Sequence, residues 1–289
     1  MLAVVGTVPD ENFPLISGEV HLEKDRIHVC DKQVPVNRGT PAMLAAVIKA
    51  GEVLGLPPPL AYLVGDIGLG HGSRRLYDHL VRHLNRSPAG VITFHYLQPD
   101  VDWHNKVLFA VEEMSPRPRL IADAGFMYAA KMSGQSTAYD LFTPDAGELA
   151  FLADEAAPHP FYTRGFILHE ENRIPDLITR AYEHNNAGRY LLVKGRQDYV
   201  ASREGVHAVI NSPVDEALEA MGGTGDTLTG IVSALIASGL DTLAAATLAA
   251  RINRLAGHYA RPTPASQVME MIEYIPNAME LVLKSAEKS

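Results

Sequence analysis

A glycine-rich segment at residues 221–230 is the strongest candidate for chemistry in this chain. It is Met-Gly-Gly-Thr-Gly-Asp-Thr-Leu-Thr-Gly, and an apolar run that is predicted to be helical begins near Thr227. Such a turn exposes backbone N–H groups at the positive end of a helix dipole, where a phosphate can bind. Asp226 adds a negative charge that a simple phosphate site would avoid. A carboxylate there is typical of a base that takes a proton from a hydroxyl beside a transferring phosphoryl group.

The same segment has a structural alternative. Asp226 or Thr224 would then cap the helix, and the glycines would allow close packing against a sheet. The length of the glycine-led pattern favours the phosphate-binding interpretation. Asp226→Asn distinguishes the catalytic base from the helix cap, because Asn caps a helix about as well as Asp but cannot accept a proton as a base.

Two further segments carry charged side chains where ligands commonly bind. Asp145 and Glu148 lie three residues apart at the start of a predicted helix, so both carboxylates can face one site. Acids in that position also stabilise the helix dipole, which is the structural alternative. An apolar strand at 191–193 ends in Lys194 and Gly195. Parallel strands bind ligands at their carboxyl ends, although a lysine at a strand end is often merely solvated.

These segments resemble a known superfamily. The Gly-x-Gly-Asp turn at 223–226 is similar to the anion-binding signature of ribokinase-like enzymes. The longer string 222–231 resembles one branch of that superfamily, the ADP- or ATP-dependent NAD(P)H-hydrate dehydratases. The stretch 141–150 and the closing segment 265–278 resemble the same branch, whereas Thr227 is a detail shared with sugar kinases.

The resemblance implies a nucleotide site with a catalytic base. Asp226 would be the base, and Mg²⁺ would be held through water near Asp145 and Glu148, since this ion prefers oxygen ligands. The residues implied in binding ATP or ADP are Lys194, Gly195, Gly222, Gly223, Thr224 and Gly225.

The resemblance is good from about Arg119 onward and poor before it. The segment Gly65–Ser73 could match either of two glycine segments of the dehydratases, and the sequence does not say which. Asp123-Ala124-Gly125 matches the family's Asp-Ala-Asp except that Gly125 replaces the second Asp. Asp123, Gly68 and Gly70 are therefore the candidate substrate-binding residues, and the acceptor stays open.

The surrounding pattern predicts the elements that would position these residues. Apolar runs at 60–64, 90–96, 119–123 and 190–194 alternate with helical patterns at 41–54, 74–84, 103–114, 148–154 and 174–185. This alternation predicts a three-layer α/β fold of the ribokinase-like kind, with a central, mostly parallel sheet and helices on both faces. No linker divides the chain, so residues 1–289 are expected to form one domain, with an N-terminal hairpin extension at about 1–35.

Composition narrows the setting. The chain has 289 residues, 47% hydrophobic and 20% charged, which is typical of a folded globular protein. A net charge of −9 without any basic run disfavours nucleic acid as a partner. The single cysteine, Cys30, suits a reducing compartment, and neither a signal sequence nor a membrane span is indicated, so we expect a cytoplasmic protein.

The sequence therefore predicts an enzyme that uses ATP or ADP and Mg²⁺ on a small hydroxylated substrate. The first hypothesis is dehydration of hydrated NAD(P)H, in which the nucleotide phosphorylates a hydroxyl and phosphate then leaves. The second is a kinase that stops at the phosphate ester of a sugar or alcohol. The third is a nucleotide-binding regulator without turnover. The oligomeric state is open, a homo-oligomer included.

Overall fold

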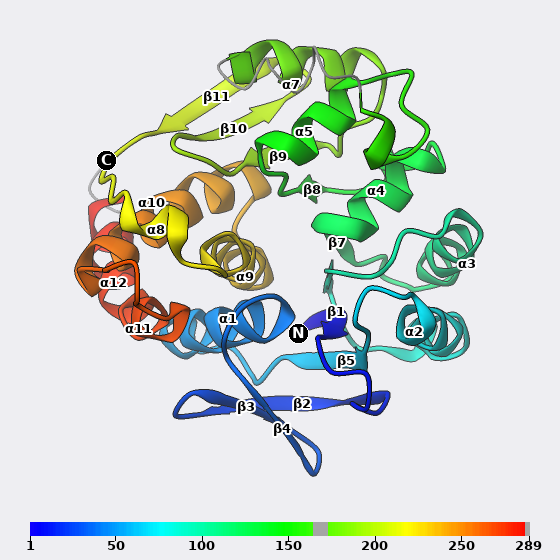
Figure 1. The fold of residues 1–289 in the computed structure, drawn as a ribbon, viewed down its shortest axis with the longest axis horizontal. Coiled ribbons are helices and arrows are strands. Elements are labelled where there is room, and N and C mark those ends of the chain that lie inside the picture. The colour runs from blue at the N-terminus through cyan, green and yellow to red at the C-terminus, as the bar shows by residue number, and fades with distance from the viewer. Residues whose placement is uncertain (164–172, 287–289) are drawn as a thin grey trace.

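Within the residues that the structure describes, an eleven-stranded sheet runs through the middle of the protein (Figure 1). The computed structural model describes residues 1–163 and 173–286. The strand order is β11-β10-β9-β8-β7-β6-β1-β5-β2-β3-β4. Its central strands are all parallel: β1 (Leu2–Val8), β5 (Leu60–Gly65), β6 (Val91–Phe94), β7 (Arg119–Ala122), β8 (Leu141–Phe142) and β9 (Tyr190–Val193). The edges are antiparallel: β10 (Asp198–Ser202) and β11 (Gly205–Ile210) on one side, β2 (Ile16–Glu23), β3 (Arg26–Val29) and β4 (Lys32–Pro35) on the other.

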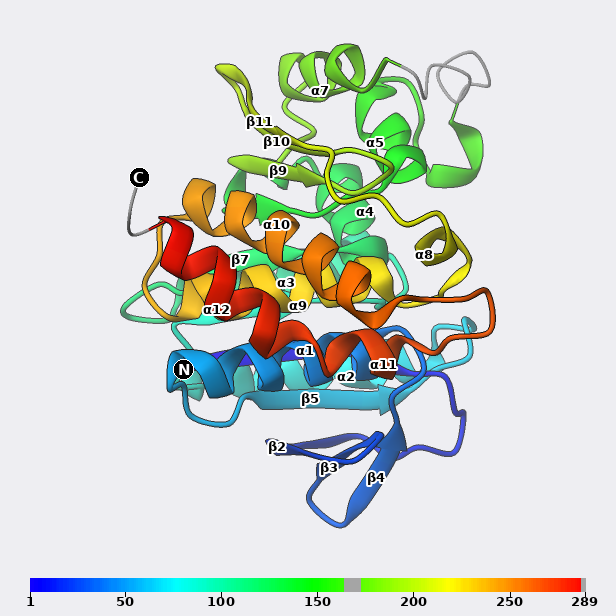
Figure 2. The same cartoon turned by 90° about the vertical axis from the view of Figure 1, so that its left-hand side faces the viewer.

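Helices cover both faces of the sheet (Figures 1 and 2). One layer contains α1 (Thr40–Leu54), α9 (Thr224–Ala237), α10 (Thr242–Ala260), α11 (Val268–Ile272) and α12 (Ile275–Ala286). The other contains α2 (His71–His83), α3 (Val101–Glu112), α4 (Ala124–Met132), α5 (Ala146–Ala153) and α7 (Ile174–Glu183). The predicted three-layer α/β architecture is confirmed. No helix of the described ranges is long and apolar enough to cross a membrane.

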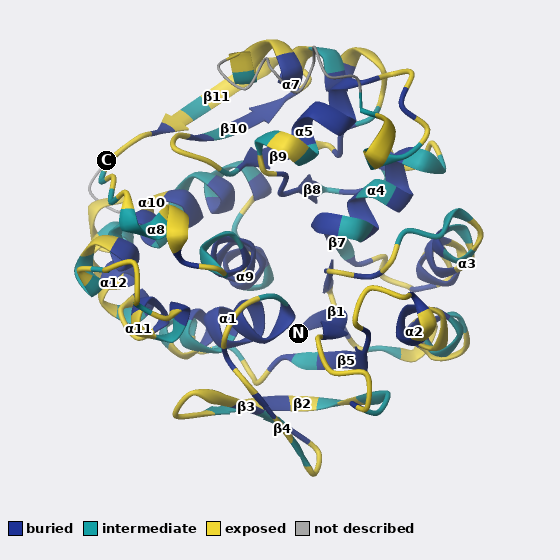
Figure 3. Ribbon diagram, in the orientation of Figure 1, coloured by how far each residue is buried: buried dark blue, intermediate teal, exposed yellow. Residues whose placement is uncertain are grey.

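The side chains on the two faces of the sheet pack into separate hydrophobic cores. Val4 and Leu63 belong to the cluster under α1 and α9, whereas their neighbours Val5 and Val64 belong to the cluster under α2 and α3. This split follows from the strand geometry, because successive side chains point to opposite faces. Figure 3 shows the buried residues gathered on the strands and on the sheet-facing sides of the helices.

The N-terminus differs from the expected extension at 1–35. All residues of β1 are buried, and the strand pairs in parallel with β5 and β6 in the middle of the sheet. Only β2, β3 and β4 extend the edge, and β2 pairs with β5. The apolar run at 2–8 gave no clear sequence signal, because continuous apolar runs lack the alternation that marks a half-exposed strand.

Other differences are local. The sequence predicted no element between Asp123 and Glu148, where α4 and β8 lie. Helix α9 begins at Thr224, three residues before the predicted start, so Asp226 stands in its first turn. The short helix α8 (Ala217–Ala220) precedes the glycine turn.

A buried histidine of α3, His104, should make the free energy of unfolding depend on pH. His104 is completely buried, its Nε2 lies 2.7 Å from the Tyr139 hydroxyl, and burial lowers its pKa from 6.5 to about 4. The unfolded chain therefore binds this proton at a higher pH than the folded one. We expect about 3 kcal/mol of stability, present above about pH 6.5, to be lost as the pH falls toward 4. Denaturant unfolding across this range should show a shallower loss for His104→Gln, and equal slopes would contradict the prediction.

Candidate active site

Two adjoining clefts open at the carboxyl ends of the parallel strands. The larger has a volume of about 460 Å³ and is lined by Asp123, Asp145, Glu148, Lys194 and the turn 223–226, among others. The smaller, of about 350 Å³, is lined by Thr7, Pro9, Arg38, Gly39, Asp66, Gly68, Tyr96 and Gln98. Tyr96 lines both. Ligands of open α/β sheets bind at this end of the strands.

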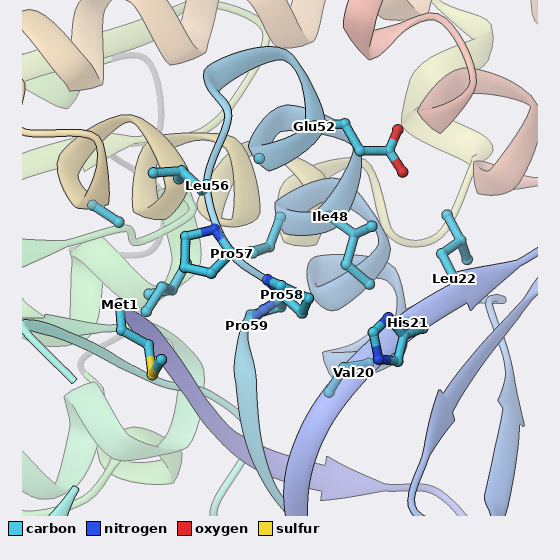
Figure 4. A pocket seen from close by; sticks show the side chains of 14 residues that line it. Met1, Val20, His21, Leu22, Ile48, Glu52, Leu56, Pro57, Pro58 and Pro59 are labelled. Carbon is cyan, nitrogen blue, oxygen red and sulfur yellow. The ribbon is translucent and has the colours of Figure 1, made fainter. Parts of the chain in front are cut away.

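Another cavity lies at the opposite ends of the strands. It has a volume of about 190 Å³ and lies between α1 and β2, where Met1 and Pro57–Pro59 precede β1 and β5 (Figure 4). Its walls are mostly apolar, with His21 and Glu52 as the ionisable members. It therefore lacks the grouped polar side chains of the two clefts at the carboxyl ends, and we assign it no chemistry.

Asp226 does not cap its own helix. The N-cap of α9 is Gly223, and no side chain caps that end. The Asp226 carboxylate instead accepts the backbone N–H of Gly39 at 2.6 Å, and its other oxygen lies 3.0 Å from His95 Nε2. Asp226 is buried but still lines the larger cleft. The structural alternative, in which this carboxylate caps α9, is therefore absent from the structure.

The environment keeps the Asp226 carboxylate ionised. Burial acts to raise its pKa, but the hydrogen bond and charge of His95, the Lys194 ammonium and the Gly39 N–H outweigh burial. The pKa of Asp226 therefore lies below its ordinary value. An ionised carboxylate that keeps free lone pairs toward a cleft is able to accept a proton.

His95 is the functional residue that sequence reasoning missed. It follows β6 and is completely buried between Asp226 and Thr40, whose hydroxyl lies 3.0 Å from His95 Nδ1. Because a carboxylate only accepts, the contact with Asp226 requires a proton on His95 Nε2. Gly6 of β1 makes room for these contacts between Thr40, His95 and Asp226, since a Cβ at Gly6 would collide with the Thr40 side chain. The signal available was the position of His95 at the end of a predicted strand.

Lys194 and Asp123 form one buried pair. The Lys194 ammonium donates to both Asp123 oxygens at 2.9 Å, and the Thr229 hydroxyl of α9 donates to the same carboxylate at 2.7 Å. Burial acts to lower the pKa of Lys194, but Asp123 and Glu148 outweigh it and raise that pKa. Asp123, predicted from sequence as substrate-binding, thus lies in the larger cleft and holds Lys194 in place.

The glycine turn places backbone N–H groups toward the larger cleft. The first N–H groups of a helix have no acceptor within it, and Thr224 and Gly225 bring these groups to the cleft. Gly223 has φ +104°, a conformation that favours glycine. Gly222 packs beside Arg38, and Gly225 beside the Lys194 side chain. Gly195, by contrast, has its N–H bonded to Asp198 and its carbonyl to Arg254.

Asp145 and Glu148 stabilise the start of a helix, which is the structural alternative to metal binding, although both still line the larger cleft. Each side chain accepts the other's backbone N–H at 2.8 Å, so together they form a capping box at the start of α5. Burial is the main factor that raises the pKa of Glu148, with Asp123 and Asp145 adding to it and Lys194 opposing it. Within the described ranges no three His, Cys, Asp or Glu side chains are grouped to hold a metal. One or two carboxylates with water and phosphate oxygens do suit Mg²⁺, so these residues fit a partly hydrated ion.

The glycine segment 65–73 shapes the smaller cleft. Gly68 and Gly70 donate their N–H groups to Asp66 at 3.0 Å, and Ser73 donates both its N–H and its hydroxyl at 2.8 Å. Gly68 lines the smaller cleft, whereas Gly70 is not among its lining residues. Gly125, which replaces the second Asp of the family pattern, has the Leu97 carbonyl directly against the position that a Cβ would take. A carboxylate therefore has no room at this position.

The fold defines the structural class of the protein. A mostly parallel sheet between two layers of helices is shared with a solved ribokinase-like superfamily protein of Enterococcus faecalis, with a TM-score of 0.55 and 16% identity. A sequence model of one family in this class, described as NAD(P)H-hydrate dehydratase, matches residues 98–277. The chain belongs to that family.

Known proteins extend the comparison. An uncharacterised protein of Methanocaldococcus jannaschii is 41% identical over 243 residues, covering 84% of this chain and 100% of that protein. The ADP-dependent (S)-NAD(P)H-hydrate dehydratase of Cenarchaeum symbiosum is 30% identical over 164 residues, 56% of this chain and 52% of its own length. The chain thus matches about half of that dehydratase. The Bacillus subtilis ADP/ATP-dependent NAD(P)H-hydrate dehydratase, co-crystallised with ATP and Mg²⁺, has the same fold, with a TM-score of 0.57, 13% identity and 97% and 89% coverage of the two chains.

Proposed function

We propose that this protein is a dehydratase of hydrated NAD(P)H that consumes ATP or ADP. The observation that carries the proposal is the buried, ionised Asp226 carboxylate, held by Gly39 and His95 where the two clefts adjoin. Family membership and the named dehydratase relative support the same activity. The larger cleft would take the nucleotide, and the smaller would take the hydroxylated acceptor.

In the first step the acceptor hydroxyl attacks the terminal phosphoryl group. Its proton passes to Asp226, the new O–P bond forms, and the bond from phosphorus to the nucleotide breaks. The N–H groups at the start of α9 are aimed at the charge that develops on this phosphoryl group. Lys194 adds a positive charge whose position is fixed by Asp123. In the second step the C–O bond breaks, inorganic phosphate leaves, and loss of a neighbouring proton completes the double bond.

Mg²⁺ would be held at the larger cleft by Asp145 and Glu148, through water. When bound, it supplies positive charge to the phosphate oxygens. Arg254 is another charged residue of the larger cleft. It is buried, and its guanidinium is paired with Asp198 at 2.6 Å. This pair connects α10 to the start of β10, and both residues line the larger cleft.

The activity is tested directly by product analysis. The protein is incubated with ATP or ADP, Mg²⁺ and NADH hydrate, and in parallel with a panel of small alcohols. Restored absorbance of NADH, with one inorganic phosphate released per turnover, is the expected result. A stable phosphate ester would instead identify a kinase, and nucleotide binding without any product would identify a regulator.

Nucleotide affinity should depend on the space beside Gly225. A Cβ at this residue would lie 3.4 Å from the Lys194 side chain, so Gly225→Val crowds the place proposed for the phosphates without demanding a left-handed backbone. Gly223→Val is a poorer test, because Gly223 has a positive φ and Val268 lies 3.1 Å from its Cβ position. We expect the Kd for ATP and ADP to rise about tenfold or more in Gly225→Val.

The matched control is Gly90→Val. Gly90 is exposed at the amino end of β6, and no atom lies within 4 Å of its Cβ position. Calorimetric titration should show wild-type nucleotide affinity for this variant. A folded Gly225→Val protein with unchanged affinity would exclude the turn from the phosphate site.

A further inference from the structure

The smaller cleft contains an arginine that has no direct partner among the described residues. Its charged lining residues in the described part of the chain are Arg38 and Asp66. The Asp66 carboxylate is occupied by the four hydrogen bonds from Gly68, Gly70 and Ser73. The Arg38 side chain is exposed and makes no hydrogen bond or ion pair within the described residues. Asp66 keeps its negative charge but makes no ion pair with Arg38, so the donors of the Arg38 guanidinium are available to an anionic group of a ligand.

Arg38 stands beside the proposed reaction centre. It directly precedes Gly39, whose N–H binds Asp226, and its Cδ lies 3.6 Å from the Cβ position of Gly222. The larger cleft has its own cations, Lys194, Arg196 and Arg254, whereas Arg38 is among the lining residues of the smaller cleft alone. An anionic group held by Arg38 would therefore belong to the acceptor and not to the nucleotide.

Tyr96 and Gln98 complete this cleft. Tyr96 has φ +52°, an uncommon conformation for a residue with a side chain, and its ring contacts His95 edge-on with a centroid distance of 4.2 Å. Backbone strain of this kind is often kept where a side chain must be aimed at a ligand. The Gln98 backbone is fixed by Ser73 and Tyr77, at 3.1 and 2.9 Å, while its side chain lines the cleft. The cleft thus offers an aromatic surface beside the base and polar donors further along.

We propose that the smaller cleft selects an acceptor whose hydroxyl-bearing ring lies near Tyr96 and whose phosphate or diphosphate group binds Arg38. Guanidinium groups bind phosphate oxygens through paired, charge-assisted hydrogen bonds. This inference rests on the proposed function, because it assumes that Asp226 activates the acceptor hydroxyl. It assigns to Arg38 the selection of phosphorylated over phosphate-free acceptors, and hydrated NAD(P)H is one such phosphorylated acceptor.

The test compares two acceptors with the same ring. Hydrated NADH carries a diphosphate, and hydrated 1-methyl-1,4-dihydronicotinamide carries no phosphate. Arg38→Gln should raise the KM for hydrated NADH about tenfold or more, while the KM for the phosphate-free acceptor and the KM for ATP stay at wild-type values. Arg86→Gln, at an exposed arginine beyond the far end of α2, is the matched control and should change none of the three.

Each contrary outcome overturns the inference. An equal rise for both acceptors would mean that Arg38 only shapes the cleft, and a rise in the KM for ATP would assign it to the nucleotide. If wild-type protein dehydrates neither acceptor, the proposed function fails on its own. Small alcohols paired with their phosphate or carboxylate derivatives then test Arg38: a preference for the anionic member that is lost in Arg38→Gln supports the site, and no such preference overturns it.

Discussion

Replacement of Asp226 by Asn is expected to lower turnover by roughly 10² to 10⁴, the usual contribution of a positioned base. The introduced amide would still present one oxygen to the Gly39 N–H, but it cannot take the hydroxyl proton. Affinity for ATP should stay level or increase, because a negative charge beside the phosphates is removed. Single-turnover kinetics and calorimetric nucleotide titration measure the two effects separately.

The control for this variant is another aspartate that does cap a helix. Asp241 is the N-cap of α10 and accepts the N–H groups of Leu243 and Ala244 at 3.0 Å. Asp241→Asn should keep wild-type turnover, since Asn caps about as well as Asp. If Asp226→Asn also turns over within a few-fold of wild type, Asp226 is not the base, and its role is to join α9 to the start of α1.

The second large effect is expected at His95, which we infer to be a positioning residue for Asp226. His95→Phe removes the partner of one carboxylate oxygen and leaves the Gly39 N–H as the remaining bond. A loss of about 10- to 100-fold in kcat is expected, in the range found when a group that orients a functional residue is removed. The KM for ATP should not change, because His95 is not among the residues that line the larger cleft.

The pH profile distinguishes positioning from a purely structural role. The hydrogen bond and charge of His95 hold the pKa of Asp226 low. Its removal should raise that pKa, so the acidic limb of kcat should move to higher pH in His95→Phe. His95→Gln keeps an N–H donor and should recover part of the loss. A reduced kcat with an unmoved acidic limb would show that His95 supports the fold but does not act on the base.

The sequence alone determined the features that depend on residues close together in the chain, namely strands, helices and turns. Apolar runs at 60–64 and 190–194 and the helical spacing at 41–54 predicted parallel strands and covering helices, because burial on both faces leaves a continuous apolar pattern. The turn at 222–226 was identified because glycines, the start of a helix and an acid are adjacent in the chain. The pairing of Asp145 with Glu148 was equally local, since three residues separate them.

Only the tertiary structure decided what surrounds Asp226. His95 is 131 positions away from it and Gly39 is 187 positions away, and no local pattern records that the ends of β6, α1 and α9 meet. The Lys194 and Asp123 pair spans 71 positions, so the sequence around either residue gave no indication of it. Residues 2–8 became the centre of the sheet because two later strands pair with them. Contacts between distant segments form where the carboxyl ends of strands lie side by side. Which strand ends are neighbours depends on the strand order of the sheet, and hydrophobic periodicity does not encode that order.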